Sequence, residues 1–274
     1  MSNRNAKNTV SNCLKEKRRC DKISSYYILR EVICLVNKLT RTYKVPVSGC
    51  DHSSKLSFIG IFNLFMDIAT EHADILNISN EYLREKNCFW VAAKTRVKVL
   101  RRPMLNEEIQ VATWPEKPGN IRCNRYCTLS DTEGVIVEAK TEWTILDGTT
   151  GKPQKTKDIY PESLEHLDDV VCAQPFERFK TDFSVCEEIG THKVVSADID
   201  MSRHMNNVAY IRMALSAFTC EELDKMNIEE IEIAYKVQCY EGEVLSIRRL
   251  MTDSGMEIGI LKEDGTCGAV MKIL

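Results

Sequence analysis

Several features are missing from this sequence of 274 residues, and each absence excludes a class of protein. Its 12 cysteines include no Cys-x-x-Cys pair, and the closest two, Cys123 and Cys127, have no second pair at zinc-finger spacing. Because no secretory signal is recognised either, we expect most cysteines to be reduced, buried side chains. The sequence therefore predicts neither a zinc site nor a disulfide framework.

A long uncharged hydrophobic run and an excess of basic residues are also missing. The most apolar stretch near the N-terminus, residues 22–39, is interrupted by Arg30 and Glu31, which rules out a signal-peptide core and a transmembrane span. The net charge of −3 argues against a nucleic-acid partner. We therefore expect no integral membrane segment and no binding of nucleic acid.

The residues that are present, 43% apolar and 28% charged, are typical of a soluble globular protein long enough for two domains. Charge is uneven, since residues 1–41 hold ten Lys or Arg against three Asp or Glu. A helix in this region is expected to lie on the protein's own surface, with a basic, surface-seeking helix as the alternative. We predict a basic and partly helical N-terminal extension at residues 1–40, a first domain at 41–160, a linker at 161–178 and a second domain at 179–274.

The pattern of apolar residues predicts an α+β fold in which a helix and a set of antiparallel strands occur twice. Residues 57–76 are apolar almost all the way round a helix, so this helix should be enclosed. A second helix, residues 206–223, carries its apolar residues on one stripe. Strands are expected at residues 42–47, 89–100, 108–114, 122–130, 135–146, 193–195, 231–239, 244–251, 256–261 and 268–273.

The two copies of this pattern align without a gap at an offset of 149 residues, so the sequence looks like an internal duplication. Asp51 then corresponds to Asp200, and Lys55 corresponds to His204. Only the second copy carries the histidine and the pair of asparagines behind it. We therefore expect the first copy to be a structural and substrate-holding half.

The segment around His204 combines a carboxylate, an imidazole and a helix start. Asn206 or Asn207 is a natural N-cap, and the first turn behind such a residue has backbone N–H groups that the helix does not use. These groups lie at the positive end of the helix dipole. A helix start of this kind can stabilise an oxyanion.

The segment Asp198-Ile-Asp-Met-Ser-Arg-His-Met-Asn-Asn-Val-Ala-Tyr-Ile211 resembles the active-site segment of hotdog-fold thioesterases, most of all that of the acyl-ACP thioesterases. Further similarity lies in Thr113-Trp-Pro115, Gly119, Thr141-Glu-Trp143 and Asp147-Gly-Thr-Thr-Gly-Lys-Pro153. The resemblance covers residues 41–274. It implies two tandem hotdog domains that form one continuous sheet around two central helices, with one active site.

The resemblance implies Asp200 as the base that activates water, and His204 as a donor to the thioester carbonyl or a partner of Asp200. Asn206 and Asn207 then act chiefly as capping and turn residues that aim the backbone donors. Both Asp200 and His204 also have a purely structural interpretation, since such an Asp usually caps a turn and a lone His is more often structural. Their occurrence together with the two asparagines favours the functional one.

Three residues near this site need separate treatment. Cys239 occupies the place of a cysteine of plant members that was once assigned as a papain-like nucleophile, but a cysteine on a strand is usually a packing residue. Ser202 stands where plant members have Asn, and Gln238 stands where they have Glu. Because an amide cannot accept a proton at neutral pH, Asp200 and His204 are left to activate water, or the enzyme is weakened.

Two further sets of residues complete the predicted site. The acyl chain is expected between the sheet and the first helix, in a pocket formed by Phe58, Phe62, Phe65 and Ala69. An acidic carrier protein is expected on a positive patch formed by Lys94, Arg96, Lys98, Arg101 and Arg102. An ordinary solvated strand face is the alternative interpretation of this patch.

Together these patterns predict a thioesterase that hydrolyses fatty acyl-ACP to free fatty acid and holo-ACP, with no metal and no cofactor. The alternatives are acyl-CoA hydrolysis on the same fold and a non-catalytic acyl-binding protein, in which Ser202 and Gln238 would be signs of decay. A homodimer stays open, because a tandem chain already supplies both hotdog domains. A bacterial cytoplasm is favoured over a plastid, because Glu16, Asp21 and Glu31 are unusual in a transit peptide.

Overall fold

The computed structural model describes residues 37–274, in which the first half of the chain forms one side of a large sheet. This half contains one long helix, one short helix and mostly long strands. Its elements are β1 (Leu39–Lys44), the 3-10 helix η1 (Val47–Gly49), α2 (Phe58–Ile75), α3 (Asn80–Glu85), β2 (Cys88–Val99), β3 (Glu108–Pro115), β4 (Cys123–Ser130), β5 (Val135–Asp147), β6 (Pro153–Gln154) and η2 (Thr156–Asp158).

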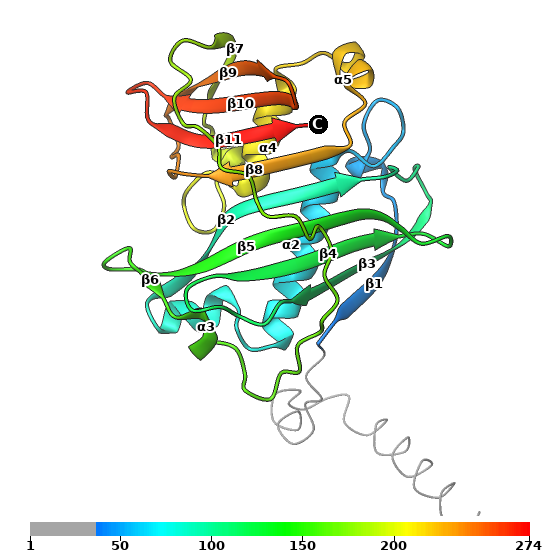
Figure 1. The fold of residues 1–274 in the computed structure, drawn as a ribbon, viewed down its shortest axis with the longest axis vertical. Coiled ribbons are helices and arrows are strands. Elements are labelled where there is room, and N and C mark those ends of the chain that lie inside the picture. The colour runs from blue at the N-terminus through cyan, green and yellow to red at the C-terminus, as the bar shows by residue number, and fades with distance from the viewer. Residues whose placement is uncertain (1–36) are drawn as a thin grey trace, which may run out of the picture. The chain divides into compact units, whose positions relative to one another are not determined.

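The second half repeats this order in a shorter form. Its elements are β7 (Glu187–Lys193), η3 (Ser196–Asp198), α4 (Asn207–Ser216), α5 (Cys220–Met226), β8 (Glu230–Tyr235), β9 (Val244–Thr252), β10 (Gly255–Lys262) and β11 (Cys267–Ile273). All strands of the described residues belong to one sheet of 11 strands, in the order β1-β3-β4-β5-β2-β8-β11-β10-β9-β7, with β6 paired to β5 outside this path (Figure 1). The predicted α+β class is confirmed.

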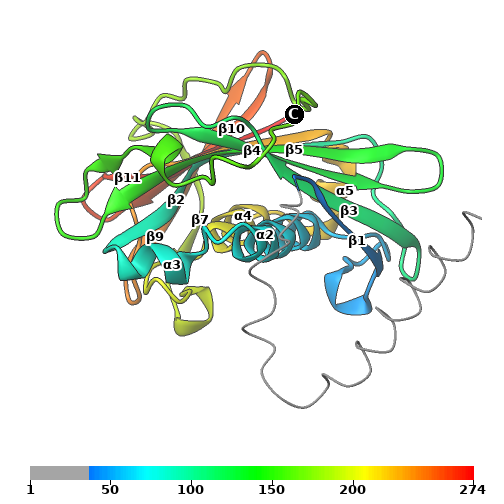
Figure 2. The same cartoon turned by 90° about the horizontal axis from the view of Figure 1, so that it is seen from below.

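The two halves share one sheet because β2 pairs with β8 in antiparallel register, from Lys94 opposite Ala234 to Lys98 opposite Glu230. Helices α2 and α4 lie beside each other on one face of the joined sheet (Figure 2). The main hydrophobic core extends over both halves. The joined sheet around two central helices is the arrangement that the resemblance implied.

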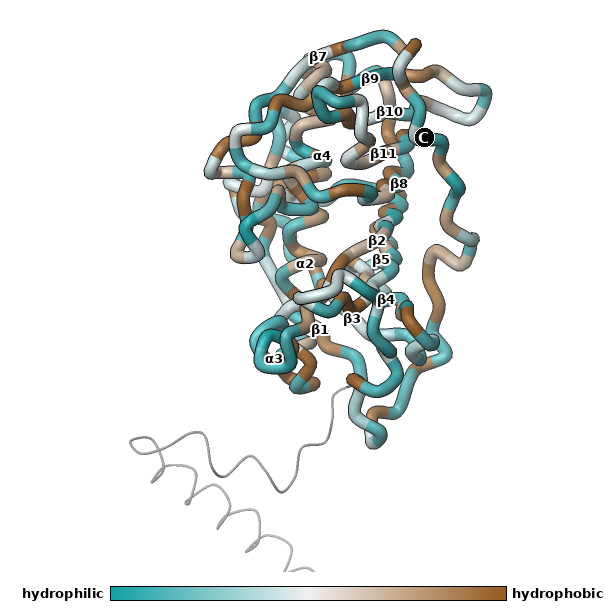
Figure 3. Tube along the Cα trace, turned by 90° about the vertical axis from the view of Figure 1, so that its left-hand side faces the viewer, coloured by the Kyte–Doolittle hydropathy of each residue, from teal (hydrophilic) through white to brown (hydrophobic). Residues whose placement is uncertain are grey.

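Hydrophobic and hydrophilic residues follow one another closely along the strands (Figure 3). On β2, Val97 and Val99 belong to the core under the helices, while Lys98 between them is exposed. This alternation is expected, since successive side chains of a strand point to opposite faces. It gives the sheet one face for the helices and one outer face.

Helix α2 buries one face against the sheet, but Asn63 and Asp67 on its other face are exposed, so the prediction of an enclosed helix is wrong. Oγ of Ser57 accepts a hydrogen bond from the backbone N of Gly60 at 2.9 Å and caps the helix. A Cβ at Gly60 would lie 2.6 Å from the carbonyl oxygen of Gly49, so only glycine fits at this approach to η1. The start of the helix is therefore held against the turn that precedes it.

The predicted repeat at an offset of 149 residues is visible in the backbone. The 3-10 helices η1 and η3 have this offset, and so do the isolated β-bridges that follow them. Ser54 and Arg203, the equivalent residues inside these turns, both have left-handed backbones, with φ of 59° and 63°. The caps of α2 and α4, Ser57 and Asn206, also differ by 149. The duplication therefore extends to the details of the turn before each helix.

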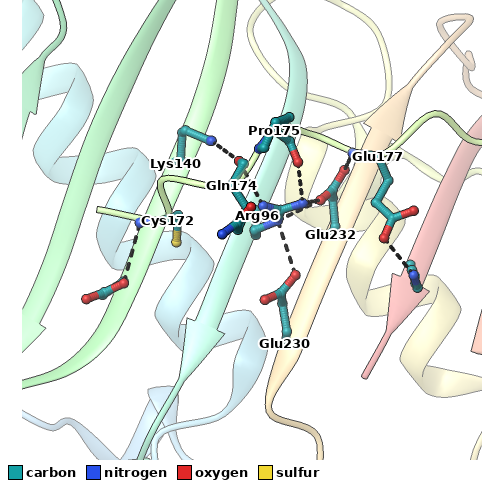
Figure 4. Close-up of polar contacts among 10 residues, drawn as sticks. Arg96, Lys140, Cys172, Gln174, Pro175, Glu177, Glu230 and Glu232 are labelled. Atoms are coloured by element: carbon teal, nitrogen blue, oxygen red, sulfur yellow. Dashed lines mark hydrogen bonds and ion pairs between the residues drawn. The ribbon is translucent and has the colours of Figure 1, made fainter. Parts of the chain in front are cut away.

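The chain between the halves crosses the outer face of the sheet, and residues 159–186 contain neither helix nor strand (Figure 4). Lys140 donates to the carbonyl oxygen of Gln174 at 2.5 Å, and Arg96 donates to that of Pro175 at 2.9 Å. Arg96 also donates to Glu232 of β8 at 2.6 Å, across the seam between the halves. This linker segment therefore fastens both halves of the sheet.

The predicted elements differ from the observed ones at several places. The strand predicted at residues 42–47 is β1, which ends at Lys44, and the strand predicted at 193–195 overlaps β7 only at Lys193. The helix predicted at residues 206–223 is divided into α4 and α5, because Thr219 caps a new helix with Glu222. The strand predicted to reach Cys239 ends at Tyr235, so Cys239 lies in the loop behind β8. The short helix α3 was not predicted.

The predicted boundaries of the domains stay a prediction, although β1 already begins at Leu39. Most of the predicted N-terminal extension, residues 1–36, lies outside the described residues. Among residues 37–274, no helix is long and apolar enough to cross a membrane.

Candidate active site

The turn between β7 and α4 folds tightly and fixes three of the predicted residues. The backbone N of Asp200 donates to the carbonyl oxygen of His204 at 3.1 Å. Oδ1 of Asp200 accepts a hydrogen bond from the backbone N of Ser202 at 2.8 Å. Arg203 closes the turn with its left-handed backbone. Asp200, Ser202 and His204 therefore have fixed backbone positions.

Asp198 directly precedes this turn and is only 3% exposed. Its carboxylate accepts hydrogen bonds from His192 at 2.8 Å, Arg212 at 2.7 Å and the backbone N of Val195 at 3.0 Å. Burial acts to raise the pKa of Asp198, but these three donors outweigh it and hold the pKa below its ordinary value. Asp198 thus stays charged and holds the loop.

One cleft of about 890 Å³ collects most of the predicted catalytic residues. The second half contributes Asp200, Ser202, His204, Asn206, Asn207 and Gln238. The first half contributes residues of α2, the start of α3 and β2, among them Met66, Thr70, Asn80 and Trp90. The cleft therefore depends on both halves of the tandem chain.

Asp200 and His204 both line this cleft, but their side chains are not hydrogen-bonded to each other. Nδ1 of His204 lies 3.3 Å from the carbonyl oxygen of Met205 and donates to it, since a carbonyl only accepts. A neutral His204 consequently carries its lone pair on Nε2. Oδ2 of Asp200 has no partner in the described chain either. Each side chain keeps one acceptor for water or substrate.

The start of α4 borders the same cleft. Oδ1 of Asn206 accepts a hydrogen bond from the backbone N of Val208 at 2.7 Å, so Asn206 is the N-cap, as predicted. The backbone N–H of Asn207, the first residue of the helix, has no acceptor among the described residues. It is the donor that this helix start can offer to a developing oxyanion.

Two family models match this chain. The acyl-ACP thioesterase N-terminal domain matches residues 36–164, and the acyl-ACP thioesterase C-terminal domain matches residues 186–268. The chain belongs to the acyl-ACP thioesterase family. The two domains of the family coincide with the two halves of the joined sheet.

Curated relatives of this chain include plant proteins. The chloroplastic oleoyl-acyl carrier protein thioesterase of Coriandrum sativum is 27% identical over 206 residues, which cover 68% of this chain and 55% of the relative. Oleoyl-acyl carrier protein thioesterase 1 of Arabidopsis thaliana is 25% identical over 251 residues, which cover 84% of this chain and 66% of the relative. The chain thus spans between about half and two thirds of the length of these relatives.

Solved structures of acyl-ACP thioesterases have the same fold. The acyl-ACP thioesterase from Bacteroides thetaiotaomicron superposes with a TM-score of 0.78 at 21% identity, covering 87% of this chain and 97% of that chain. The 12:0-ACP thioesterase from Umbellularia californica superposes with a TM-score of 0.74 at 15% identity, covering 87% of this chain and 96% of that chain. The double hotdog fold expected from the sequence is confirmed.

Cys239, which the family resemblance brought forward as a nucleophile, does not line this cleft. Its side chain is buried, and burial raises the pKa of its thiol. Its backbone N donates to the hydroxyl of Tyr210 at 3.0 Å, and its carbonyl oxygen accepts from the backbone N of Met205 at 2.8 Å. These contacts favour the packing interpretation.

An apolar pocket continues from this cleft, and the two share Met66, Thr70, Trp90 and Trp143. Its inner part is lined by Ala69, Ala73, Ile78, Arg125 and Tyr160. Of the predicted acyl-pocket residues, only Ala69 borders it. Phe62 and Phe65 are packed in the core, and Phe58 lines a separate cavity at the start of α2. The phenylalanines of the predicted set fill their own space, whereas the alanines near the end of α2 leave room.

The predicted carrier-protein patch is not one exposed surface. Arg96 is only 6% exposed, because the linker and the glutamates of β8 enclose it (Figure 4). Lys94 donates to the carbonyl oxygen of Glu177 at 2.9 Å. Lys98, Arg101 and Arg102 line the separate cavity that also contains Phe58. The expected stripe therefore does not form, since the linker covers part of this strand face.

Sequence reasoning missed several residues of the cleft and of the apolar pocket. Trp143 was noted only as part of a motif, although its Nε1 is buried and has no hydrogen-bond partner among residues 37–274. Trp90 stands against it in an edge-on contact at 6.3 Å between ring centroids. Arg84 of α3 also lines the cleft. Two tryptophans on the neighbouring strands β2 and β5 were the sequence signal that could have located the entrance of the apolar pocket.

Proposed function

We propose that this chain hydrolyses the thioester of fatty acyl-ACP and releases a free fatty acid and holo-ACP. The observation that carries the proposal is one cleft that presents Asp200 and His204 and continues into an apolar pocket. Membership in the family and the names of its relatives support acyl-ACP as the substrate. Acyl-CoA serves as the comparison substrate in the test below.

The proposed reaction is a direct attack by water. Oδ2 of Asp200 and Nε2 of His204 are the free acceptors that can hold a water and take its proton. The water oxygen bonds to the carbonyl carbon, and the negative charge that moves onto the carbonyl oxygen is stabilised by the N–H of Asn207 at the helix start. The C–S bond then breaks, and the leaving sulfur receives the proton and departs as a thiol.

Gln238 and Ser202 take supporting roles in this proposal. Oε1 of Gln238 accepts a hydrogen bond from the hydroxyl of Tyr240 at 3.0 Å, which leaves the amide NH₂ to donate. Such a donor can orient a carbonyl but cannot take a proton from water. Ser202 holds Asp200 through its backbone N and keeps its hydroxyl on the cleft. Base catalysis therefore rests on Asp200 and His204.

We further propose a reducing compartment, the bacterial cytoplasm or a plastid stroma. The support is that the nine cysteines of residues 37–274 are all free thiols, several of them buried. A single chain supplies both walls of the cleft, so we propose that one copy is sufficient for activity.

The test is thiol release from acyl-ACP and acyl-CoA of several chain lengths, with wild type and Asp200→Asn in parallel. We expect wild type to release thiol from acyl-ACP with a higher kcat/KM than from acyl-CoA, and the variant to lose this release. If wild type binds acyl chains without releasing thiol, the chain is an acyl-binding protein and the hydrolase proposal fails.

A further inference from the structure

A second recess adjoins the active-site cleft at the same turn. The two share Asn80, Arg84, Met201, Ser202, His204 and Gln238. The recess adds Asn87, Cys88, Phe89, Gly148, Arg203 and Tyr240. None of the alanines of the acyl pocket borders it. The reactive turn therefore lies where two branches meet, one apolar and one polar.

The polar branch differs from the rest of the cleft in charge. Two arginines, Arg84 of α3 and Arg203 of the turn, line it, and no Asp or Glu does. Both arginines are exposed, and neither forms an ion pair with any residue between 37 and 274. Carboxylates gather instead along the neighbouring cleft, which is lined by Asp67, Glu71, Asp74, Glu81 and Asp200. An anionic part of a substrate is thus attracted to the recess and repelled from the cleft beside it.

The other side chains of the recess suit a chain of amide groups. Asn80, Asn87 and Gln238 carry carboxamides that can both donate and accept hydrogen bonds. Phe89 and Met201 add apolar surface between them. A phosphopantetheine arm has the same composition, since it consists of two amides joined by short alkyl segments and ends in a phosphate ester.

We propose that Arg84 and Arg203 bind the phosphate of the phosphopantetheine arm while the thioester lies against Asp200 and His204. The position of the thioester rests on the proposed function. A guanidinium pair is suited to this task because it offers several N–H donors to phosphate oxygens. The phosphate is a diester on a carrier protein and part of a diphosphate in CoA, and both sources present the same chemistry to the two arginines.

The experiment compares three thioesters of one acyl chain: acyl-ACP, acyl-CoA and acyl-pantetheine, which lacks the phosphate. For the double variant Arg84→Ala/Arg203→Ala, we expect the ratio of kcat/KM for a phosphate-bearing substrate to that for acyl-pantetheine to fall about tenfold, mainly through KM. Arg84→Lys/Arg203→Lys should restore part of it. Lys86→Ala is the matched control, because Lys86 is the C-cap of α3, two residues after Arg84, and lines neither branch.

The substrates that show this fall in the ratio tell which phosphate the two arginines bind, or that they bind none. A fall confined to acyl-CoA assigns the arginines to the phosphates of CoA, and a fall with both substrates assigns them to the shared group. A fall confined to acyl-ACP shows contact with the carrier protein's surface and overturns the phosphate assignment, as does an unchanged ratio.

A binding measurement keeps this test independent of the proposed reaction. Titration of wild type with 4′-phosphopantetheine and with pantetheine should show tighter binding of the phosphate form, and the double alanine variant should lose the difference. A preference for phosphate without any hydrolysis would leave the recess as proposed and remove only the hydrolase. Equal binding of both compounds would remove the phosphate site whatever the activity.

Discussion

Asp51 forms an ion pair with Arg102, and this contact occupies the first half's copy of the reactive turn. Burial acts to raise the pKa of Asp51, but hydrogen bonds from Arg102 and Ser53 lower it overall. In the second half, the equivalent Asp200 has only the bond from Ser202. Gln238 occupies the place of Arg102, because the next residue in each half bonds to the turn through its carbonyl oxygen. The two equivalent carboxylates therefore differ: Asp51 is ion-paired, whereas Asp200 forms no ion pair with residues 37–274.

Asp200→Asn and Asp51→Asn should separate chemistry from stability. We expect Asp200→Asn to lower kcat for thiol release about 10²- to 10⁴-fold, because the proposed base is lost. Asp51→Asn should keep kcat within about twofold and lower the free energy of unfolding by about 1 kcal/mol, because a partly buried ion pair is broken. Rates and urea denaturation of both variants check this. A comparable loss of kcat in both would show that the turns act as one unit.

Cys239→Ala should keep most of the activity and cost stability. The thiol is buried with a raised pKa and does not reach the cleft, so no nucleophile is removed. The cavity left by the sulfur should lower the free energy of unfolding by about 1 kcal/mol. The measurement is thiol release together with thermal denaturation. Loss of activity in a variant that still folds would restore the nucleophile role.

Asp198→Asn should destabilise the protein in a pH-dependent way. The folded pKa of Asp198 lies below its ordinary value of 3.8, so its charged form contributes stability above that pH, and the contribution is lost as the pH falls through the folded pKa. We expect a loss of about 1–3 kcal/mol at pH 7 that shrinks below about pH 4.

Urea denaturation of wild type and this variant at several pH values measures the difference. Glu221→Gln is the control, because Glu221 forms an exposed pair with Lys225 and should change little at any pH. A difference for Asp198→Asn that stays constant from pH 3 to 7 would show that its charge is not the cause.

Ala73→Leu should shift the preferred acyl chain toward shorter lengths. Ala73 lines the inner part of the apolar pocket, and the three added carbons take the space of about three methylenes. We expect the optimum to move by about two to four carbons. Phe58→Leu, at the other end of α2, should leave the optimum unchanged. If Phe58→Leu moves the optimum and Ala73→Leu does not, the acyl chain occupies the cavity at the start of α2.

Local patterns in the sequence were sufficient for most strands, for the two main helices and for the repeat, but not for α3 or for the division between α4 and α5. The apolar surface of α2, the capping by Asn206 and the offset between Asp51 and Asp200 depend on residues close together in the chain. The turn that carries Asp200 and His204 could be predicted for the same reason. Family resemblance then gave roles to residues whose positions were already fixed locally.

The remaining features depend on contacts that no local pattern encodes. The linker has no periodicity, so nothing in its sequence predicts that Gln174 and Pro175 cover Arg96. The acyl pocket lies where Ala69 and Ala73 face the sheet, which depends on which space the neighbouring side chains leave unfilled. The recess beside Ser202 combines α3, which was not predicted, with a turn more than 100 residues later.

The joining of two hotdog halves in one chain has an evolutionary consequence. In a symmetric pair of identical chains, an arginine at the position of Arg102 would stand beside both carboxylates and close both sites at once. Here a single codon change affects one half alone, so Arg102 can hold Asp51 while Asp200 stays open. Joining the halves in one chain thus lets each half acquire its own substitutions, which a pair of identical chains cannot do.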